Sequence, residues 1–122
     1  SYLGIDIAGN IVVTSSLGGG GGSGDISYSR RAITSTATAS SDDTLLGVSA
    51  SAAIDIRLPS AGDYEGGQYF IIKDEAGNAN VNNITVKASG SQTIDGYTSI
   101  ILESPYVSIN LYSNGTDKFF IY

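Results

Sequence analysis

Two pairs of adjacent acidic residues, Asp42-Asp43 and Asp74-Glu75, are the groups in this chain most suited to acid–base chemistry. Carboxylates that cleave a glycosidic bond stand about 5 to 9.5 Å apart, on opposite sides of the sugar. Neighbouring residues of a strand point to opposite faces, so neither pair meets this requirement by itself. Aspartate also satisfies backbone donors in turns, and we interpret both pairs as turn residues. The sequence therefore predicts no catalytic residue.

The connection from Asp74 to Asn83 is rich in oxygen ligands and contains Gly77, which makes it a candidate calcium loop. Its spacing differs from the D-x-[DN]-x-[DN]-G pattern that ends on a glutamate. We therefore interpret this segment as a solvated hairpin loop and expect no metal site, with calcium binding as the alternative.

The composition of the 122-residue chain excludes much ordinary enzymology, because it contains no His, Cys, Met or Trp. Serine–histidine catalysis, thiolate nucleophiles and almost all zinc or iron sites are thereby excluded. Six basic and twelve acidic residues give a net charge of −6, which offers no electrostatic footprint for nucleic acid or an anionic membrane. We expect no cofactor, no nucleic-acid partner and no membrane insertion.

The acidic residues named above must be positioned by β-strands, because apolar side chains recur with a period of two almost throughout the chain. The segment Ile54-Asp55-Ile56-Arg57 shows the alternation most clearly, with its isoleucines expected inside and its charges outside. About eight to ten short strands follow one another at a spacing of roughly 8 to 12 residues. The prediction is an all-β protein, an antiparallel β-sandwich of jelly-roll-like type.

The chain is expected to have three parts. Residues 1–17 are predicted to form a β-hairpin that serves as a shaft or attachment segment, turning at Ala8-Gly9-Asn10. Residues 18–25 form a glycine-rich linker, expected to be flexible because glycine loses the most backbone entropy on ordering. Stacked chains that order this run are the alternative. Residues 26–122 are predicted to be the head domain.

Polar and aromatic residues in the predicted loops are candidates for a binding surface. Tyrosine stacks on sugar rings and anchors interfaces with little loss of entropy. Tyr64 and Tyr97 lie in loops near glycine and are expected to be exposed, and Asn78, Asn80 and Asn114 lie in loops or turns. These five residues form the predicted receptor-binding set.

The chain from about residue 32 to residue 122 resembles a C-terminal module of bacteriophage tail fibres and virion spike or fibre proteins. The matching segments are strand and turn signatures. They are a Thr-rich strand, Asp-Asp-Thr-Leu-Leu-Gly-Val at 42–48, Ile-Asp-Ile-Arg-Leu-Pro-Ser at 54–60, Tyr-Phe-Ile-Ile-Lys-Asp-Glu-Ala-Gly-Asn-Ala at 69–79, Asn-Asn-Ile-Thr-Val at 82–86, Gln-Thr-Ile-Asp-Gly at 92–96, Val-Ser-Ile-Asn-Leu-Tyr-Ser-Asn-Gly at 107–115 and a final aromatic strand.

The resemblance implies a compact β-sandwich, usually a homotrimer, that is displayed on a virion for attachment to the host cell. It supplies no catalytic residue. A trimer also accords with the low charge of the chain, because few lysines or prolines are present to protect exposed sheet edges. We therefore expect a homotrimer on the virion surface that binds other virion proteins through its N-terminal segment and a host receptor, such as a glycan, through its head.

Two other functions remain open at this point. The first is a purely structural domain that decorates a capsid or trimerises a fibre. The second is a glycan depolymerase, which the short chain, the lack of histidine and the unsuitable acidic pairs disfavour. We expect a protein that is not an enzyme.

Overall fold

The computed structural model describes residues 5–6, 10–11 and 29–122, and these residues are organised almost entirely as β-strands. β1 (Ile5–Asp6) and β2 (Asn10–Ile11) pair antiparallel. The rest of the predicted 1–17 segment and the whole predicted linker, 18–25, lie outside the described residues. No helix in the described part of the chain has the length and apolar character needed to cross a membrane.

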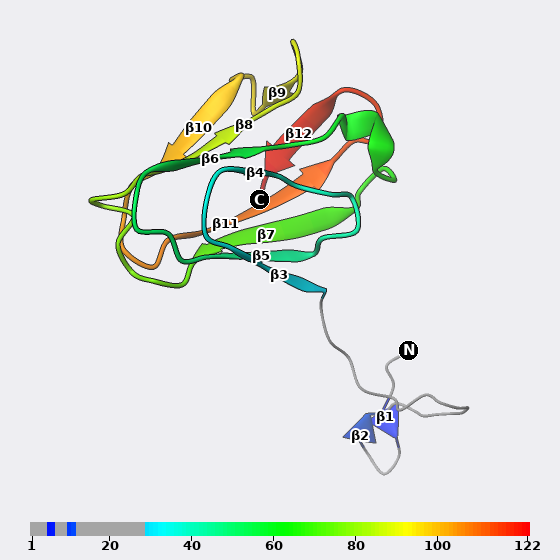
Figure 1. The fold of residues 1–122 in the computed structure, drawn as a ribbon. Coiled ribbons are helices and arrows are strands. Elements are labelled where there is room, and N and C mark those ends of the chain that lie inside the picture. Colours follow the sequence, from blue (N-terminus) through cyan, green and yellow to red (C-terminus); the bar gives the residue numbers. More distant parts are fainter. Residues whose placement is uncertain (1–4, 7–9, 12–28) are drawn as a thin grey trace.

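The other strands form a six-stranded and a four-stranded sheet (Figure 1). In spatial order the larger sheet contains β3 (Arg30–Ile33), β5 (Leu45–Val48), β7 (Tyr69–Asp74), β11 (Ser108–Ser113), β12 (Lys118–Ile121) and β9 (Thr93–Ile94). The smaller sheet contains β10 (Ser99–Leu102), β8 (Ile84–Lys87), β6 (Ile54–Arg57) and β4 (Ala37–Thr38). A short 3-10 helix, Ala61–Asp63, lies between β6 and β7.

From β3 to β8 the chain alternates between the two sheets, so that each strand is followed by one in the opposite sheet. As a result, β3, β5 and β7 run parallel to one another, and so do β4, β6 and β8. Parallel neighbours need a long crossover connection, which is usually a helix. In this protein a strand of the other sheet takes that place.

The last part of the chain adds antiparallel pairs. β10 pairs antiparallel with β8, and β11 pairs antiparallel with both β7 and β12, whereas β9 runs parallel to β12. The prediction of an all-β protein is confirmed, but the prediction of antiparallel sheets is wrong, because both sheets are mixed. Period-two patterning reports which face of a strand is buried and carries no information on the direction of its neighbour.

The two sheets share one hydrophobic core. Isoleucines Ile54 and Ile56 are buried and Arg57 is exposed, as the alternation in the sequence predicts. The largest side chains that are almost completely buried come from both sheets: Leu46, Val48, Phe70, Ile72, Ile94, Leu111 and Phe119 from the larger, and Ile56, Ile84 and Val86 from the smaller. In Figure 1 the smaller sheet lies above β7, β5 and β3, and the C-terminus ends β12 near the middle of the view.

Candidate functional site

Tyr64, one of the predicted receptor-binding residues, lies in the core. Its side chain is only 4% exposed. Its ring stacks on Phe70 at 5.4 Å between centroids and meets the edge of Phe119 at 5.6 Å. The expectation of an exposed Tyr64 is therefore wrong. The 3-10 helix before it turns the chain inward, and two buried rings give this large apolar side chain a favourable place to pack.

The hydroxyl of Tyr64 is buried without a hydrogen-bond partner among the described residues. Burial, followed by the negative charges of Asp43 and Asp63, raises the pKa of this phenol far above its ordinary value of 10. We expect Tyr64→Phe to leave the free energy of unfolding unchanged or to raise it by up to about 1 kcal/mol, because an unsatisfied polar atom leaves the core.

Chemical denaturation of the wild type and of Tyr64→Phe measures this effect. Tyr97→Phe is the matched control, because it removes a hydroxyl from a side chain that is 67% exposed. Destabilisation by Tyr64→Phe of more than about 1 kcal/mol would contradict the prediction and would show that the hydroxyl is satisfied in solution.

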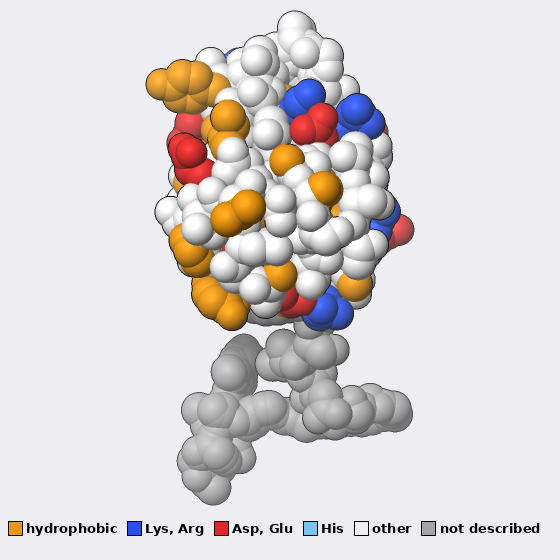
Figure 2. Space-filling view, turned by 60° about the vertical axis from the view of Figure 1, so that its left-hand side comes forward, with side chains coloured by type: hydrophobic (Ala, Val, Ile, Leu, Met, Phe, Trp, Pro, Cys, Tyr) orange, Lys and Arg blue, Asp and Glu red, His pale blue; other side chains and the backbone are white. Residues whose placement is uncertain are grey.

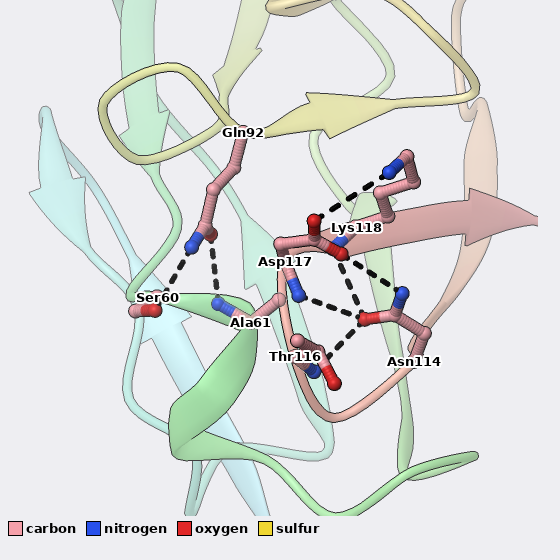
Figure 3. Close-up of polar contacts among 7 residues, drawn as sticks. All are labelled: Ser60, Ala61, Gln92, Asn114, Thr116, Asp117 and Lys118. Atoms are coloured by element: carbon pink, nitrogen blue, oxygen red, sulfur yellow. Dashed lines mark hydrogen bonds and ion pairs between the residues drawn. The ribbon is translucent and has the colours of Figure 1, made fainter.

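Asn114 is exposed, but its side chain organises the turn between β11 and β12 (Figure 3). Its Oδ1 accepts hydrogen bonds from the backbone N–H groups of Thr116 at 2.9 Å, Asp117 at 2.9 Å and Lys118 at 3.0 Å. Its Nδ2 donates to Asp117 Oδ1 at 3.1 Å, and this bond keeps the pKa of Asp117 below its ordinary value. These bonds give Asn114 a structural role in the turn.

Figure 3 also shows Gln92, which directly precedes β9, hydrogen bonded to Ser60 and Ala61 at the start of the 3-10 helix. Gln92 Oε1 accepts from the backbone N–H of Ala61 at 2.8 Å, and its Nε2 donates to Ser60 Oγ at 3.0 Å. Ser113 Oγ, which is buried, donates to the carbonyl oxygen of Ala61 at 2.7 Å. The polar side chains here therefore connect loops to one another.

The segment 74–83, predicted to be a solvated hairpin loop with calcium binding as the alternative, is organised around the carboxylate of Asp74, which is only 1% exposed. Oδ1 accepts from the backbone N–H of Gly77 at 3.1 Å, and Oδ2 accepts from those of Ala79 at 2.9 Å and Tyr106 at 3.0 Å. Burial opposes the charged form of Asp74, but these hydrogen bonds outweigh it and lower the pKa of the carboxyl below 3.8. Both of its oxygens therefore accept hydrogen bonds from backbone N–H groups.

Acid is expected to destabilise the protein through Asp74. Because its folded-state pKa lies below its unfolded-state value, Asp74 contributes stability above about pH 4, and this is lost as the pH falls through the folded-state pKa. Glu75 acts in the same direction, because its hydrogen bond from Arg30 lowers its pKa below 4.5.

Denaturant midpoints measured between about pH 7 and about pH 3 test this expectation, and Asp74→Asn should flatten part of the decline. A midpoint that stays constant or rises on acidification would contradict it.

The other predicted residues of the binding set do not form one surface. Asn78 donates through Nδ2 to the carbonyl oxygen of Ala50 at 3.0 Å, and Asn80 is exposed in the same loop. This loop follows β7, whereas the Asn114 turn follows β11, and β7 and β11 are antiparallel. The two asparagine groups therefore lie at opposite ends of the larger sheet. The expectation of a single loop surface is wrong.

Tyr97 is exposed as expected and follows the predicted tight turn at Asp95-Gly96. Both turn residues have positive φ, 50° and 89°, and Ile94 and Tyr97 exchange backbone hydrogen bonds across the turn. This is the geometry of a two-residue hairpin, so the predicted turn is confirmed.

Three of the four residues in the acidic pairs, Asp43, Asp74 and Glu75, have structural partners. Asp43 Oδ2 accepts from Arg31 Nη1 at 3.1 Å and from the backbone N–H of Ser40 at 2.9 Å. Glu75 pairs with Arg30, and Asp74 accepts backbone hydrogen bonds as described above. Within the described part of the chain, no group of three or more acidic, histidine or cysteine side chains is placed to hold a metal ion.

The structure reveals instead a cluster of aromatic side chains on the outer face of the larger sheet, which we call the aromatic platform: Tyr69, Tyr112, Phe120 and Tyr122. Tyr112 on β11 lies opposite Tyr69 on β7 and Phe120 on β12. Its ring lies 5.5 Å from that of Phe120 and 5.7 Å from that of Tyr122, tilted by 36° and 57°. Tyr69 is 45% exposed and Tyr122 is 59% exposed.

A shallow depression opens on this platform and is lined by Gly67, Tyr69, Tyr112 and Tyr122. Gly67 precedes β7, has a φ of 86° and donates its N–H to the carbonyl oxygen of Ser113 at 2.7 Å. A Cβ atom at this position would meet no other atom within 4 Å. The depression is therefore open to solvent beside Gly67, and tyrosines form its sides.

The outer face of the smaller sheet is mostly polar. It carries Asp55, Arg57, Thr85 and Lys87, together with the exposed Ile101 of β10 opposite Thr85. Lys87 Nζ lies 3.0 Å from Asp55 Oδ2. Figure 2 shows one face of the molecule on which orange hydrophobic side chains stand among uncharged ones, with blue and red side chains often adjacent. Of the two sheets formed by residues 30–121, the larger one therefore carries the cluster of aromatic rings on its outer face.

The platform cannot be read from the sequence, because its residues are 53 positions apart at the extremes and converge only through strand pairing. The signal in the sequence was the alternation around Tyr69 and Tyr112, which places each next to a buried neighbour, Phe70 or Leu111. Neither a protein-family model nor a curated protein matches this chain. The resemblance to tail-fibre modules accordingly stays a prediction.

Proposed function

We propose that this protein is a non-enzymatic head domain of a virion fibre or spike, displayed on the virion surface, that attaches the particle to a host-cell receptor. The observation that carries the proposal is the aromatic platform, with Tyr69 and Tyr122 about half exposed on the outside of a sheet. Large exposed aromatic groups are characteristic of interaction sites, since their rings bind partners with little loss of conformational entropy.

Binding without hydrolysis is favoured over depolymerase activity by the roles of the acidic pairs. Asp43 is hydrogen bonded to Arg31, Asp74 is buried among backbone donors and Glu75 is paired with Arg30. A glycosidase needs two carboxylates that face a sugar from opposite sides. Under this proposal the protein binds its receptor without cleaving it.

Attachment to cells tests this function. Fluorescently labelled full-length protein is expected to be retained on cells of at least one strain in a panel of bacteria. The double variant Tyr69→Ala/Tyr122→Ala should lose retention, whereas Tyr97→Ala should keep it, because Tyr97 is 67% exposed but lies outside the platform. Equal retention of both variants, or no retention on any strain, would contradict the proposal.

We further propose that the fold is a β-sandwich of two mixed sheets that assembles as a homotrimer through the edge strand β10. This strand, Ser99–Leu102, contains no charged residue and no proline, and Ile101 is 55% exposed. An edge strand without such protection readily pairs with another chain. Three copies would then multiply weak individual receptor contacts through avidity.

Replacing Ile101 by lysine is expected to convert the trimer to a monomer, because a buried ammonium group at each interface would lack a partner. Light scattering of the full chain measures the mass. Val81→Lys is the matched control, since Val81 is 74% exposed in the loop after β7, and it should leave the trimer intact. A wild-type protein with the mass of a single chain would contradict the assembly, although it would leave the receptor site unaffected.

A further inference from the structure

We infer that the aromatic platform binds one ring of a neutral pyranoside, which stacks against Tyr122 and Tyr69 in the depression beside Gly67. This inference rests on the proposed attachment function and names the class of receptor. Its support is the exposed area, the shape and the charge of the platform.

The exposed area fits a small ligand better than a second protein. Tyr69 and Tyr122 are 45% and 59% exposed, so together they present about the surface of one fully exposed tyrosine. That surface is on the order of 200 Å². A stable protein interface needs about 800 Å² from each partner. These two rings therefore match a single sugar ring in size, and they supply only a small part of the area that a second copy of this chain would have to cover.

The shape of the platform also suits a ring. The Tyr112 ring is tilted by 36° to Phe120 and by 57° to Tyr122, so the aromatic surface is stepped and does not form one plane. The depression between the tyrosines opens beside Gly67, where no side chain stands. A pyranoside presents C–H groups on one face and hydroxyls around its rim. Tyrosine matches both, because it has an apolar ring and a hydroxyl tip.

The charge around the platform favours a neutral sugar over an acidic one. None of the four residues that line the depression has a charged side chain. Arg30, Arg31, Lys87 and Lys118 are engaged in ion pairs with Glu75, Asp43, Asp55 and Asp117, and Lys73 donates to the carbonyl oxygen of Tyr106. The sixth basic residue, Arg57, is exposed on the smaller sheet, away from the platform. The chain has a net charge of −6, which repels anions. A sialic or uronic acid would therefore find no cation in the depression.

Saturation-transfer NMR with the full-length protein tests the inference, because it detects millimolar binding to a single site. The probes are the methyl glycosides of glucose, galactose, mannose and N-acetylglucosamine, with those of glucuronic acid and N-acetylneuraminic acid as acidic counterparts. At least one neutral glycoside is expected to receive saturation, most strongly at the protons of its apolar face. The acidic probes are expected to receive none.

The variants assign the binding to the platform. Tyr122→Ala and Tyr69→Ala are each expected to weaken the best neutral glycoside by about tenfold, the loss of one stacked ring. Tyr122→Phe should retain most of the affinity, and the matched control Tyr97→Ala should retain all of it. Unchanged denaturation midpoints will show that these outer-face variants are folded.

The results that would overturn the inference can be distinguished from those that would contradict the proposed attachment function. If cells retain the wild type but not the platform variants, and no neutral glycoside binds, the receptor is not a neutral pyranoside and attachment stands. Preference for an acidic probe, or a change of molecular mass in Tyr122→Ala, would overturn it in favour of an anionic ligand or a second copy. If a neutral glycoside binds the platform but no cells are retained, the attachment function fails instead.

Discussion

Replacing Asp74 by alanine is expected to lower the free energy of unfolding by about 3 kcal/mol, because several buried backbone donors lose their acceptor at once. The carboxylate, 1% exposed, accepts from Gly77, Ala79 and Tyr106, which belong to two different loops. Its removal therefore disconnects the loop after β7 from the loop before β11. Tyr106 also has a positive φ of 62°, a conformation that this contact helps to maintain.

Urea denaturation of the full chain measures the effect. Asp42→Ala is the matched control, since Asp42 is an exposed aspartate in another turn, and it should change stability by less than about 0.5 kcal/mol. Asp74→Asn keeps the size of the side chain but turns an amide N–H toward a donor, so we expect an intermediate loss. Equal stability of Asp74→Ala and Asp42→Ala would contradict the central role of this carboxylate.

The second large effect is expected at Gly115, in the turn between β11 and β12. Its φ is 81°, and a Cβ atom would lie 2.8 Å from the backbone nitrogen of Gly66 and 3.0 Å from its Cα. Gly115→Ala therefore combines a left-handed backbone with a clash against a neighbouring loop, and the loss should be about 3 kcal/mol. A backbone neighbour cannot move aside as a flexible side chain can.

Gly96 provides the control that separates the two contributions. It has a similar φ of 89°, but a Cβ atom there would meet nothing within 4 Å. Gly96→Ala should therefore cost only the conformational part, about 1 to 2 kcal/mol. Equal losses in the two variants would show that the contact with Gly66 has no influence on stability.

Gly47, on the outer face of the larger sheet, leaves room for the side chain of Glu75. A Cβ atom at this position would overlap the carboxyl group of Glu75, which pairs with Arg30 on β3. The Arg30–Glu75 pair thus covers the backbone of β5 near one edge of the sheet. The aromatic platform lies on β7, β11 and β12 of the same sheet, so the outer face has a charged part and an aromatic part.

Local features of the fold were predictable from the sequence. The alternation in Ile54-Asp55-Ile56-Arg57 identified a half-buried strand, and Asp95-Gly96 identified a two-residue turn, because both depend only on neighbouring residues. The direction of the strands was not predictable in this way. Each parallel pair is set by a crossover through the opposite sheet, which no local pattern encodes.

The candidate site shows the same division. Tyr64 and Tyr97 both stand near glycines in loops, yet the first is 4% exposed and the second 67%. What separates them is the presence of Phe70 and Phe119 at the position where the chain turns Tyr64 inward. Composition alone shows that the chain contains eight tyrosines, without showing which are exposed or where they gather.

The amino-acid sequence by itself determined that this protein is built of strands, that it lacks histidine and thiolate chemistry, and where its tight turns lie. The tertiary structure alone decided that Tyr69, Tyr112, Phe120 and Tyr122 come together, because their meeting depends on the register between β7, β11 and β12. The physical reason is the separation along the chain of the residues that interact. Turns and alternation arise from contacts between adjacent residues, whereas a binding surface arises from pairing between segments that the sequence keeps far apart.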